Sequence, residues 1–335
     1  MIENDTALRE SVVGFSAKIG SDPLLTQGAG GNVSWKDGDT LWIKASGTWL
    51  ADAAEKNIFV PVSLSEIVTS IEQGNFDVRP AALDGQALRP SIETTLHALM
   101  PHRIVVHVHA VEALAYLVRS SGIEQLRSRL GDSMRWTAVP YCKPGADLAK
   151  GVHLALEGCS ADAVFLQNHG VVLGGDTIVE IEALLATLSS KLKTPPLPPA
   201  ATAPVSELDA AGRVYHALPG ASIQALALDP VRFDRLRADW ALYPDHVVFL
   251  GAAAPCFDKV GEIEGAASAP DMCIVSDLGV FATAEFSNAK RAQLLCYADV
   301  LARQQPNETL QSLDMAQVSE LLGWDSERYR IGLEK

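Results

Sequence analysis

Paired cysteines are missing from this sequence. Its five cysteines stand singly among 335 residues, with no C-x-x-C spacing, at Cys142, Cys159, Cys256, Cys273 and Cys296. An odd, scattered set is typical of reduced thiols in a protein core, and it argues against a disulfide framework or a thiolate zinc site. Any metal site must therefore use nitrogen and oxygen ligands.

Long apolar runs and an excess of positive charge are also missing. No stretch approaches the roughly 18 apolar residues of a membrane span, and the N-terminus lacks the cationic and apolar regions of a signal peptide. Lys and Arg total 27 against 41 Asp and Glu, a net charge of −14, which repels nucleic acid and anionic lipid. We expect a cytoplasmic protein with no membrane or nucleic-acid partner, in which local donors hold any bound phosphate.

Two histidines stand two residues apart within the apolar run Arg103-Ile-Val-Val-His-Val-His-Ala110. Such a run predicts a strand, and residues i and i+2 of a strand project from the same face. His107 and His109 would then form half of a transition-metal site, for which Zn²⁺ is the usual ion. The alternative is a pair of histidines on the solvent face of an amphipathic strand.

Two loops rich in small residues precede this run. Gln27-Gly-Ala-Gly-Gly-Asn-Val-Ser-Trp35 holds three glycines in four residues, and such a backbone can turn sharply and present N–H groups to an anion. Gly31 and Asn32 belong to this loop, and Ser46 and Gly47 belong to the second. A plain hairpin turn is the alternative, because the Gly-Lys-Ser/Thr ending of a nucleotide-binding P-loop is absent.

Capping residues and periodicity predict the elements around these motifs. Ser91 is expected to cap a helix with Glu93 in its first turn, and His97 faces the same way as a supporting or surface residue rather than a ligand. The other expected elements of this half are helices 6–19, 63–71, 111–118 and 148–157, and strands 40–44, 57–62 and 136–141.

A polar trio interrupts the apolar strand expected over residues 163–173. It consists of Gln167, Asn168 and His169. Burying three polar side chains within such a run lowers stability unless each has a partner or a function. The trio is therefore a candidate part of the functional site.

A proline-rich stretch divides the chain, with five prolines in residues 194–204. Such a segment forms neither helix nor sheet. We expect a metal-binding domain over residues 1–193, a linker over 194–206 and a C-terminal α/β domain of unknown role over 207–335. The pattern of the last predicts helix 207–218, strands 246–250 and 272–275, and helix 288–303.

Two segments of the C-terminal domain resemble segments of the first. Residues 244–251 resemble 101–108, and residues 273–281 resemble a segment from about 165 to 173, with Leu278 in the place of His169. The hypothesis is that the second domain is a degenerate copy of the first without its metal ligands. Chance similarity between two α/β segments is the alternative.

The candidate metal ligands together offer three nitrogens and one carboxylate. They are Glu93, His107, His109 and His169. This set fits a catalytic zinc rather than a closed structural site, and a carboxylate there can leave the metal and act as a base. Neutral donors for a nearby phosphate would come from Asn32, Ser46, Gly47 and Ser91.

Five motifs resemble the class II aldolase/adducin family over roughly residues 5–193, in the family's order and spacing. They are Gly30-Gly-Asn-Val-Ser34, Lys44-Ala-Ser-Gly47, Pro90-Ser-Ile-Glu93, His107-Val-His109 and Asn168-His-Gly170. The resemblance implies an α/β fold, a three-layer α/β/α domain with a central, mainly antiparallel sheet, followed here by the smaller α/β domain. The residues around the motifs most resemble those in the aldolase part of bacterial bifunctional rhamnulose-phosphate aldolase/alcohol dehydrogenases.

The resemblance implies a zinc-dependent aldehyde-lyase, with another divalent transition metal as an alternative. Such an enzyme reversibly cleaves a ketose phosphate to dihydroxyacetone phosphate and an aldehyde through a metal-stabilised enediolate. The implied roles are Glu93 as catalytic residue and ligand, His107, His109 and His169 as ligands, and Gly31, Asn32, Ser46, Gly47 and Ser91 as the phosphate site. By family analogy the assembly is a homo-oligomer, a cyclic tetramer.

Two departures keep other functions open. Ile92 stands where phosphate-binding relatives often carry a second Ser or Thr, which leaves room for a sugar-acid substrate. The family's acid tyrosine is not assigned to a residue here, although Tyr116 and Tyr141 lie near the motifs in the sequence. A sugar-phosphate epimerase, decarboxylase or dehydratase on the same scaffold is the main alternative. A non-catalytic adducin-like assembly protein would not need the ligands, and the expected helices argue against a cupin-type β-barrel.

Overall fold

The structure is a computed structural model that describes residues 6–198, 204–265 and 269–324. These residues fall into two compact units, one of residues 6–117 and 121–193 and the other of residues 118–120 and 194–324. Both are α/β, in agreement with the predicted fold class. Part of the expected linker (199–203) and the end of the expected C-terminal domain (325–335) lie outside the described residues.

The first unit is built on a seven-stranded sheet in the order β3-β2-β1-β4-β7-β6-β5. Only β5 and β6 pair in parallel, so the predicted mainly antiparallel sheet is confirmed. The strands are β1 (Asn32–Asp37), β2 (Thr40–Lys44), β3 (Phe59–Ser63), β4 (Ile104–Val108), β5 (Trp136–Val139), β6 (Ala163–Leu166) and β7 (Gly170–Gly175).

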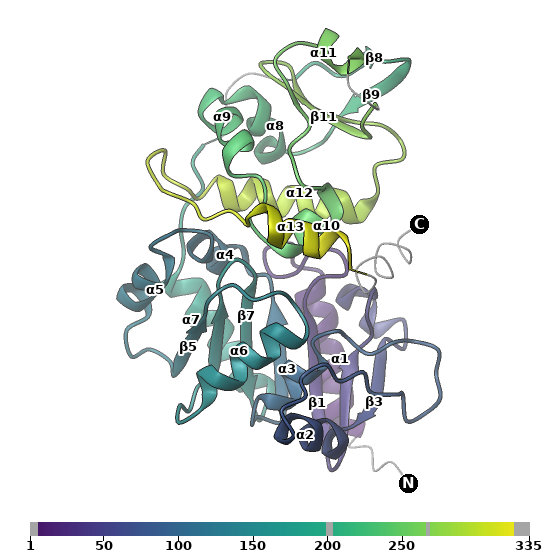
Figure 1. Ribbon diagram of the computed structural model, residues 1–335, viewed down its shortest axis with the longest axis vertical. Helices are drawn as coiled ribbons and strands as arrows, with labels where there is room; N and C mark the ends of the chain where they lie inside the picture. Colours follow the sequence, from purple (N-terminus) through teal and green to yellow (C-terminus); the bar gives the residue numbers. More distant parts are fainter. Residues whose placement is uncertain (1–5, 199–203, 266–268, 325–335) are drawn as a thin grey trace. The chain divides into compact units, whose positions relative to one another are not determined.

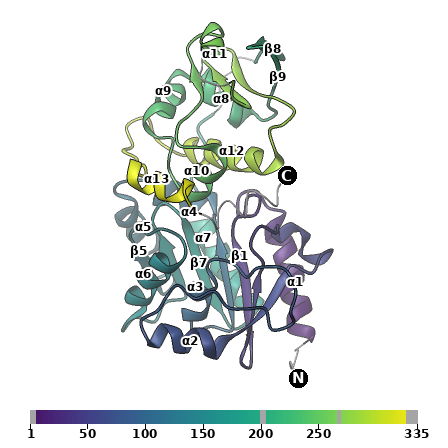
Figure 2. The ribbon, with the colours of Figure 1, turned by 45° about the vertical axis from the view of Figure 1, so that its right-hand side comes forward.

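Helices cover both faces of this sheet (Figures 1 and 2). Apolar side chains of α2, α3 and α6 pack on one face, and those of α1, α4, α5 and α7 pack on the other. The central strands are consequently buried on both sides and read as continuous apolar runs. The helices are α1 (Thr6–Gly20), η1 (Leu50–Ala54), α2 (Leu64–Glu72), α3 (Thr94–Leu99), α4 (Val111–Leu117), α5 (Gly122–Leu130), α6 (Ala146–Leu156) and α7 (Ile178–Lys191).

The second unit has a five-stranded sheet in the order β10-β11-β12-β9-β8. Its strands are β8 (Glu207–Ala210), β9 (Arg213–Ala217), β10 (Cys256–Phe257), β11 (Met272–Val275) and β12 (Gly279–Ala282). Its helices are α8 (Ala221–Leu228), α9 (Pro230–Ala238), α10 (Pro244–Leu250), α11 (Gly261–Glu264), α12 (Asn288–Leu301) and α13 (Met315–Leu322).

Two of the expected elements are hairpins instead. Residues 163–173 were predicted as one strand, but Asn168 adopts a φ of 54° and reverses the chain, so β6 and β7 pair antiparallel. Residues 207–218 were predicted as a helix, but Ala211 and Gly212, with φ of 51° and 67°, join strands β8 and β9. In both places a residue with positive φ reverses the chain, and the pattern of apolar and polar side chains does not reveal this backbone conformation.

Two helices also differ from the prediction. Residues 246–250 form the last part of α10 rather than a strand, because Pro244 begins a helix that is buried over most of its length, and a short all-apolar run does not separate the two states. Ser91 is not the cap of α3, which begins at Thr94 with Glu93 as its N-cap residue. The Ser91 hydroxyl accepts the Glu93 backbone N–H at 3.2 Å.

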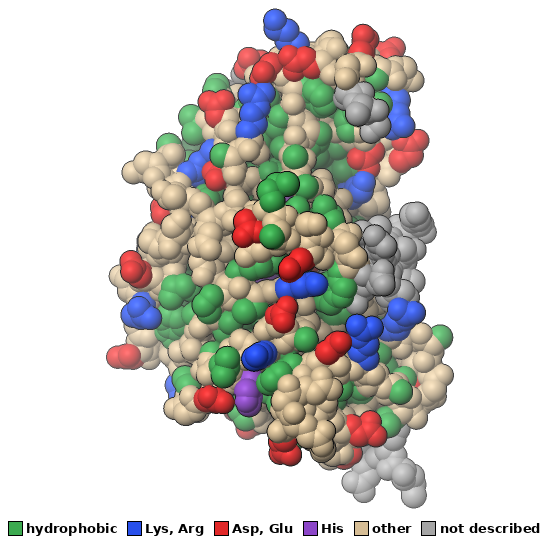
Figure 3. Space-filling model, viewed as in Figure 1, with side chains coloured by type: hydrophobic (Ala, Val, Ile, Leu, Met, Phe, Trp, Pro, Cys, Tyr) green, Lys and Arg blue, Asp and Glu red, His purple; other side chains and the backbone are tan. Residues whose placement is uncertain are grey.

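Two surface and helix properties concern possible interaction with membranes or nucleic acid. Acidic and basic side chains are interspersed on the face shown in Figure 3, and neither sign covers it continuously. Among the helices of the described residues, none combines the length and the apolar character needed to cross a bilayer.

Candidate metal centre

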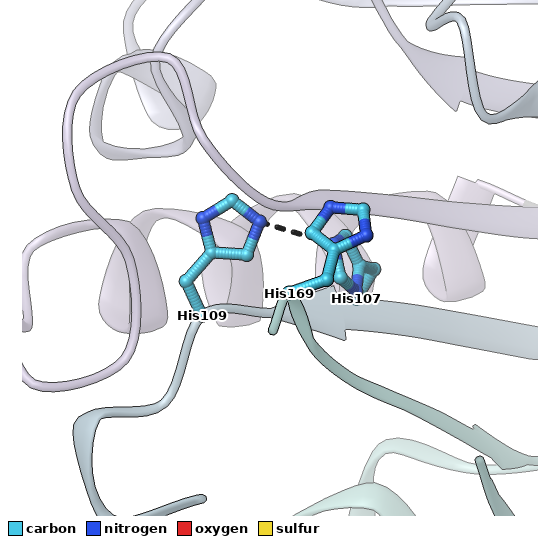
Figure 4. A group of neighbouring side chains, drawn as sticks. All are labelled: His107, His109 and His169. Atoms are coloured by element: carbon cyan, nitrogen blue, oxygen red, sulfur yellow. Dashed lines mark hydrogen bonds between the residues drawn. The ribbon is translucent and has the colours of Figure 1, made fainter. Parts of the chain in front are cut away.

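Three histidines meet at one end of the first unit's sheet (Figure 4). His107 lies near the end of β4 and His109 follows that strand, so both rings leave the same face. His169 lies in the turn that leads into β7, the neighbour of β4, and Val108 pairs with Val171. The antiparallel register therefore brings His169 beside the other two residues.

The three imidazoles converge within 4.8 Å of one another through one ring nitrogen each. The Nε2 atoms of His107 and His109 are 3.1 Å apart. All three side chains are buried, with 0%, 3% and 5% exposure for His107, His109 and His169. A solvent-exposed pair on an amphipathic strand, the alternative left open above, is therefore wrong.

The carboxylate of Glu93 completes this cluster from the N-terminus of α3. Its Oε2 lies 3.6 Å from His107 Nε2, and its Oε1 lies 3.5 Å from His169 Nε2. Glu93 is itself buried at 6% exposure. The structure thus brings together all four residues singled out in the sequence as metal ligands.

The arrangement fits a divalent ion in two respects. Ligands about 2.0–2.1 Å from a tetrahedral zinc lie about 3.3 Å from one another. Three separations are close to this value, 3.1 Å between His107 and His109 and 3.6 and 3.5 Å from the two Glu93 oxygens to His107 and His169, and the imidazole nitrogens all lie within 4.8 Å of one another. Within the described residues, the buried Glu93 Oε1 has no hydrogen-bond partner. A buried carboxylate oxygen among imidazole nitrogens is satisfied by a cation.

A hydrogen-bond network fixes the carboxylate. Asn32 Nδ2 donates to Glu93 Oε2 at 2.7 Å, and Asn32 Oδ1 accepts from His97 Nε2. His97 Nδ1 lies 2.7 Å from the Ser34 hydroxyl, which therefore donates to it. These contacts assign His97 the tautomer protonated on Nε2, and they make it a supporting residue as the sequence suggested.

A hydrogen bond to the neighbouring strand β7 orients the ring of His107. Its Nδ1 donates to the backbone carbonyl of Val171 at 3.1 Å. This bond leaves Nε2 as the nitrogen that faces the cluster. A histidine whose second ring nitrogen donates to a carbonyl is the usual form of a metal-bound imidazole.

Burial and charge act in opposite directions on these groups. Burial alone would raise the pKa of Glu93, but the neighbouring His107 and His169 and the hydrogen bond from Asn32 outweigh it and lower the pKa to about 2. Burial lowers the pKa of His97 to about 3. Glu93 is therefore ionised and His97 neutral at neutral pH, as the network requires.

The residues proposed for phosphate lie on adjoining segments. Ser46 N–H donates to Arg89 O at 2.8 Å, and Ser91 N–H donates to Lys44 O at 3.2 Å. Asn32 Nδ2 reaches the Ser91 hydroxyl at 3.4 Å. Gly31 and Gly47 have φ of 66° and 78°, which open the two loops. Both polar atoms of the Asn32 amide already have protein partners, however, which weakens its assignment to phosphate.

Lysine 44 has a role that the sequence analysis missed. Its ammonium group is buried at the end of β2, and it donates to Ala29 O at 2.8 Å and Gly31 O at 3.0 Å. These bonds hold the glycine loop against the sheet. The sequence did contain a clue, because a lysine that ends an apolar strand of Leu-Trp-Ile is expected to find partners.

Fold and cluster together define a three-layer α/β domain with a buried site of the metal-binding kind. The chain belongs to the family described as Class II Aldolase and Adducin N-terminal domain, which matches residues 13–193.

Two curated relatives each match about half of this chain. The uncharacterized oxidoreductase YuxG of Bacillus subtilis is 30% identical over 188 residues, which cover 50% of this chain and 26% of that protein. L-fuculose phosphate aldolase of Methanococcus vannielii is 27% identical over 166 residues, covering 48% of this chain and 80% of that protein. The chain thus spans about a quarter of the length of the first relative.

Solved structures are similar to somewhat more than half of this chain. The N-terminal class II aldolase domain of a conserved Thermoplasma acidophilum protein is 27% identical with a TM-score of 0.48, covering 57% of this chain and 94% of that one. An L-fuculose 1-phosphate aldolase is 20% identical with a TM-score of 0.41, covering 56% of this chain and 85% of that one.

Proposed function

We propose that this protein is a metal-dependent aldehyde-lyase, which reversibly cleaves a ketose phosphate to dihydroxyacetone phosphate and an aldehyde. The observation that carries the proposal is the convergence of Glu93 with three buried imidazoles, His107, His109 and His169. Zinc is the first expectation for such a set, with other divalent transition metals as alternatives. The resemblance of the sequence motifs to those of bifunctional rhamnulose-phosphate aldolases and the similarity to a fuculose phosphate aldolase support the same reaction class.

The chemistry divides between the ion and the carboxylate. A divalent ion held there would supply a Lewis acid for the substrate's carbonyl. Glu93 is anchored through Oε2 by Asn32, whereas Oε1 has no hydrogen-bond partner in the described part of the chain. In the cleavage direction, the ionised Glu93 would take up the proton released from the hydroxyl that becomes the aldehyde and pass it to the carbon that loses the aldehyde. In the synthetic direction it would remove the proton from that carbon and return it to the aldehyde oxygen.

A second candidate is the same proton chemistry on a sugar acid without phosphate, as an epimerase, decarboxylase or dehydratase. The observations that favour it are the engagement of the Asn32 amide by Glu93 and His97 and the apolar Ile92 that precedes Glu93 in the sequence. Fewer donors then remain for a phosphate in the segments that hold Ser46, Gly47 and Ser91. A non-catalytic adducin-like assembly role would leave the buried ligand cluster without a purpose.

Activity on a substrate panel tests the proposal. The metal-loaded protein and Glu93→Gln would be given ketose 1-phosphates and sugar acids, with dihydroxyacetone phosphate and carbon dioxide measured. We expect release of dihydroxyacetone phosphate, and a kcat lowered about 10²–10⁴-fold in the variant, because a general acid–base is lost. Turnover of sugar acids alone would replace the first candidate by the second, and no turnover of either class would refute both.

We further propose that the chain forms a homo-oligomer, a tetramer by family analogy. Native mass spectrometry of the full chain measures this directly. A mass of four times the 35.8 kDa chain is expected, and a monomer at micromolar concentration would contradict it.

A further inference from the structure

The second unit repeats the strand arrangement of the first. Its order β10-β11-β12-β9-β8 corresponds strand by strand to β5-β6-β7-β4-β1, and both sets follow the same order along the chain. The first pair of each set is parallel and the other three pairs are antiparallel. Five strands can be ordered and oriented in many ways. Agreement in every respect therefore exceeds the general likeness of two α/β sheets.

The hairpins β6–β7 and β11–β12 also share their backbone hydrogen bonds. Asn168 and Asp277 occupy equivalent turn positions with φ of 54° and 60°. Their N–H groups donate to Leu117 O and Ala227 O, each at 3.1 Å, in the helices that follow β4 and β9. Further matched bonds are Gln167 N to Val139 O and Ser276 N to Phe257 O at 3.0 Å, and Gly174 N to Asp162 O at 2.8 Å and Thr283 N to Asp271 O at 2.9 Å.

The strand register identifies which residues of the second unit occupy positions equivalent to the metal ligands of the first. Leu166 pairs with Gly170 and Val275 with Gly279, so the residue before each glycine is equivalent. His107 pairs with Val172, and Ala217 pairs with Phe281 at the same place in the second sheet. The positions of His107, His109 and His169 are therefore taken by Ala217, Pro219 and Leu278. None of the three replacements can bind a metal.

A glutamine occupies the space of the imidazoles. A Cβ added to Gly170 would meet ring carbons of His107 and His109 at 3.0 and 3.1 Å, whereas a Cβ added to Gly279 would meet Gln224 Oε1 at 2.7 Å. The two glycines are equivalent in register, so Gln224 packs beside Gly279 as the imidazoles pack beside Gly170.

Hydrogen bonds hold this glutamine in place. Gln224 Nε2 donates to Leu218 O at 2.6 Å and Val280 O at 2.9 Å, and its Oε1 accepts from Val280 N–H at 2.8 Å. Val280 corresponds to Val171, whose carbonyl accepts from His107 in the first unit. The same backbone carbonyl therefore orients an imidazole in one unit and a neutral amide in the other.

The second unit also lacks the insertion that carries the rest of the candidate site. Strands β8 and β9 are joined by the turn at Ala211 and Gly212. The equivalent strands β1 and β4 are separated by residues 38–103, which contain β2, β3, α2 and α3. Glu93 and the serines proposed for phosphate all belong to that insertion.

We propose that the second unit is a degenerate repeat of the metal-binding unit, in which Gln224 has replaced the metal site. The chain then binds one divalent ion per polypeptide, and the ion binds in the first unit. One of the two sequence similarities noted above supports this relation, that of the β6–β7 and β11–β12 hairpins. The other aligned α10 with β4 and is wrong, because the equivalent of β4 is β9.

Reconstruction of the site in the full chain tests the repeat. The background variant His107→Ala/His109→Ala/His169→Ala removes the imidazoles of the first unit. To it are added Ala217→His, Pro219→His, Leu278→His and Gln224→Ala. Titration with Co²⁺, followed by visible absorption and calorimetry, is expected to show no site in the background and one equivalent in the reconstructed variant. Leu278→His alone in the same background is the matched control and should bind none.

Each outcome bears on the proposal separately from enzyme activity. Tight binding of Co²⁺ by the background variant would overturn it, because the second unit would then hold a metal itself. A folded reconstructed variant without a Co²⁺ site would overturn the register on which it rests. If that variant does not fold, Ala217→His/Leu278→His is titrated with Cu²⁺, and binding no stronger than that of Leu278→His alone is the refuting result. Failure of wild-type protein to turn over any sugar would affect only the proposed reaction.

Discussion

At the scale of single residues, burial decides what each histidine can do. His97 is completely buried and neutral, between the Ser34 hydroxyl and the Asn32 amide. His153 lies on α6 with its side chain 38% exposed, 3.5 Å from Glu157. The same side chain is thus a fixed part of a network in one place and a surface group in the other.

We predict that His97→Ala weakens metal binding about 10–100-fold, because Asn32 then no longer holds Glu93 in position. The variant should also lose about 1–3 kcal/mol of stability for each polar group left unpaired. Metal titration and denaturant unfolding measure the two effects. His153→Ala is the control, with a change in stability within about 0.5 kcal/mol. Equal metal affinities in His97→Ala and His153→Ala would disprove a supporting role for His97.

A second buried histidine predicts a pH effect on stability. His246 lies among Trp240, Tyr243 and Tyr297 in the second unit, and burial lowers its pKa to about 3. The unfolded chain, with a pKa near 6.5, binds the proton more readily than the folded chain. Above pH 6.5 His246 is neutral in both states. As the pH falls from 6.5 toward 3, the unfolded chain binds the proton and the folded chain does not, so the free energy of unfolding decreases.

Comparison with His246→Phe isolates this effect from the carboxylates that titrate in the same range. Unfolding free energy of wild type should fall between pH 6 and 4 by up to about 1.4 kcal/mol per pH unit more than that of the variant. Parallel pH profiles for the two proteins would show that folding does not change the pKa of His246, and would contradict this prediction.

At the scale of elements, close backbone approach shapes the site. Gly170 begins β7, and a Cβ there would meet Val108 O at 2.6 Å as well as the His107 ring. We predict that Gly170→Ala destabilises the protein by about 1–3 kcal/mol and weakens metal binding. Gly14→Ala in the exposed face of α1, where a Cβ meets nothing within 4 Å, should instead stabilise by about 0.5–1 kcal/mol. Thermal unfolding distinguishes them, and equal shifts would contradict the packing argument.

Helices and strands were predictable from the sequence where the side-chain pattern alone determines the backbone conformation. The apolar run of β4 and the helices α1 and α2 follow from periodicity and capping. The hairpins at Asn168 and Ala211 were missed because a single positive φ decides them, and α10 was missed because a short buried run has no alternation. The metal cluster was predictable as a set of residues. The network through His97 and the bonds from Lys44 to the glycine loop were not, because both depend on contacts between distant segments.

At the scale of the whole molecule, two compact units predict two unfolding events. A metal bound only to the first unit stabilises that unit by about 2.7 kcal/mol at a free concentration of 100 times Kd. We predict that calorimetry of the full chain shows two unfolding transitions, and that EDTA lowers the midpoint temperature of only one of them. A shift of both transitions would indicate a second metal site or a single cooperative unit.

The most direct test of the account is the metal content of the full chain after dialysis against trace zinc, measured by mass spectrometry. Wild type should retain one equivalent per polypeptide, His107→Ala should lose it, and His153→Ala should keep it. An unchanged metal content in folded His107→Ala would contradict the central claim that the buried imidazoles of the first unit hold the ion.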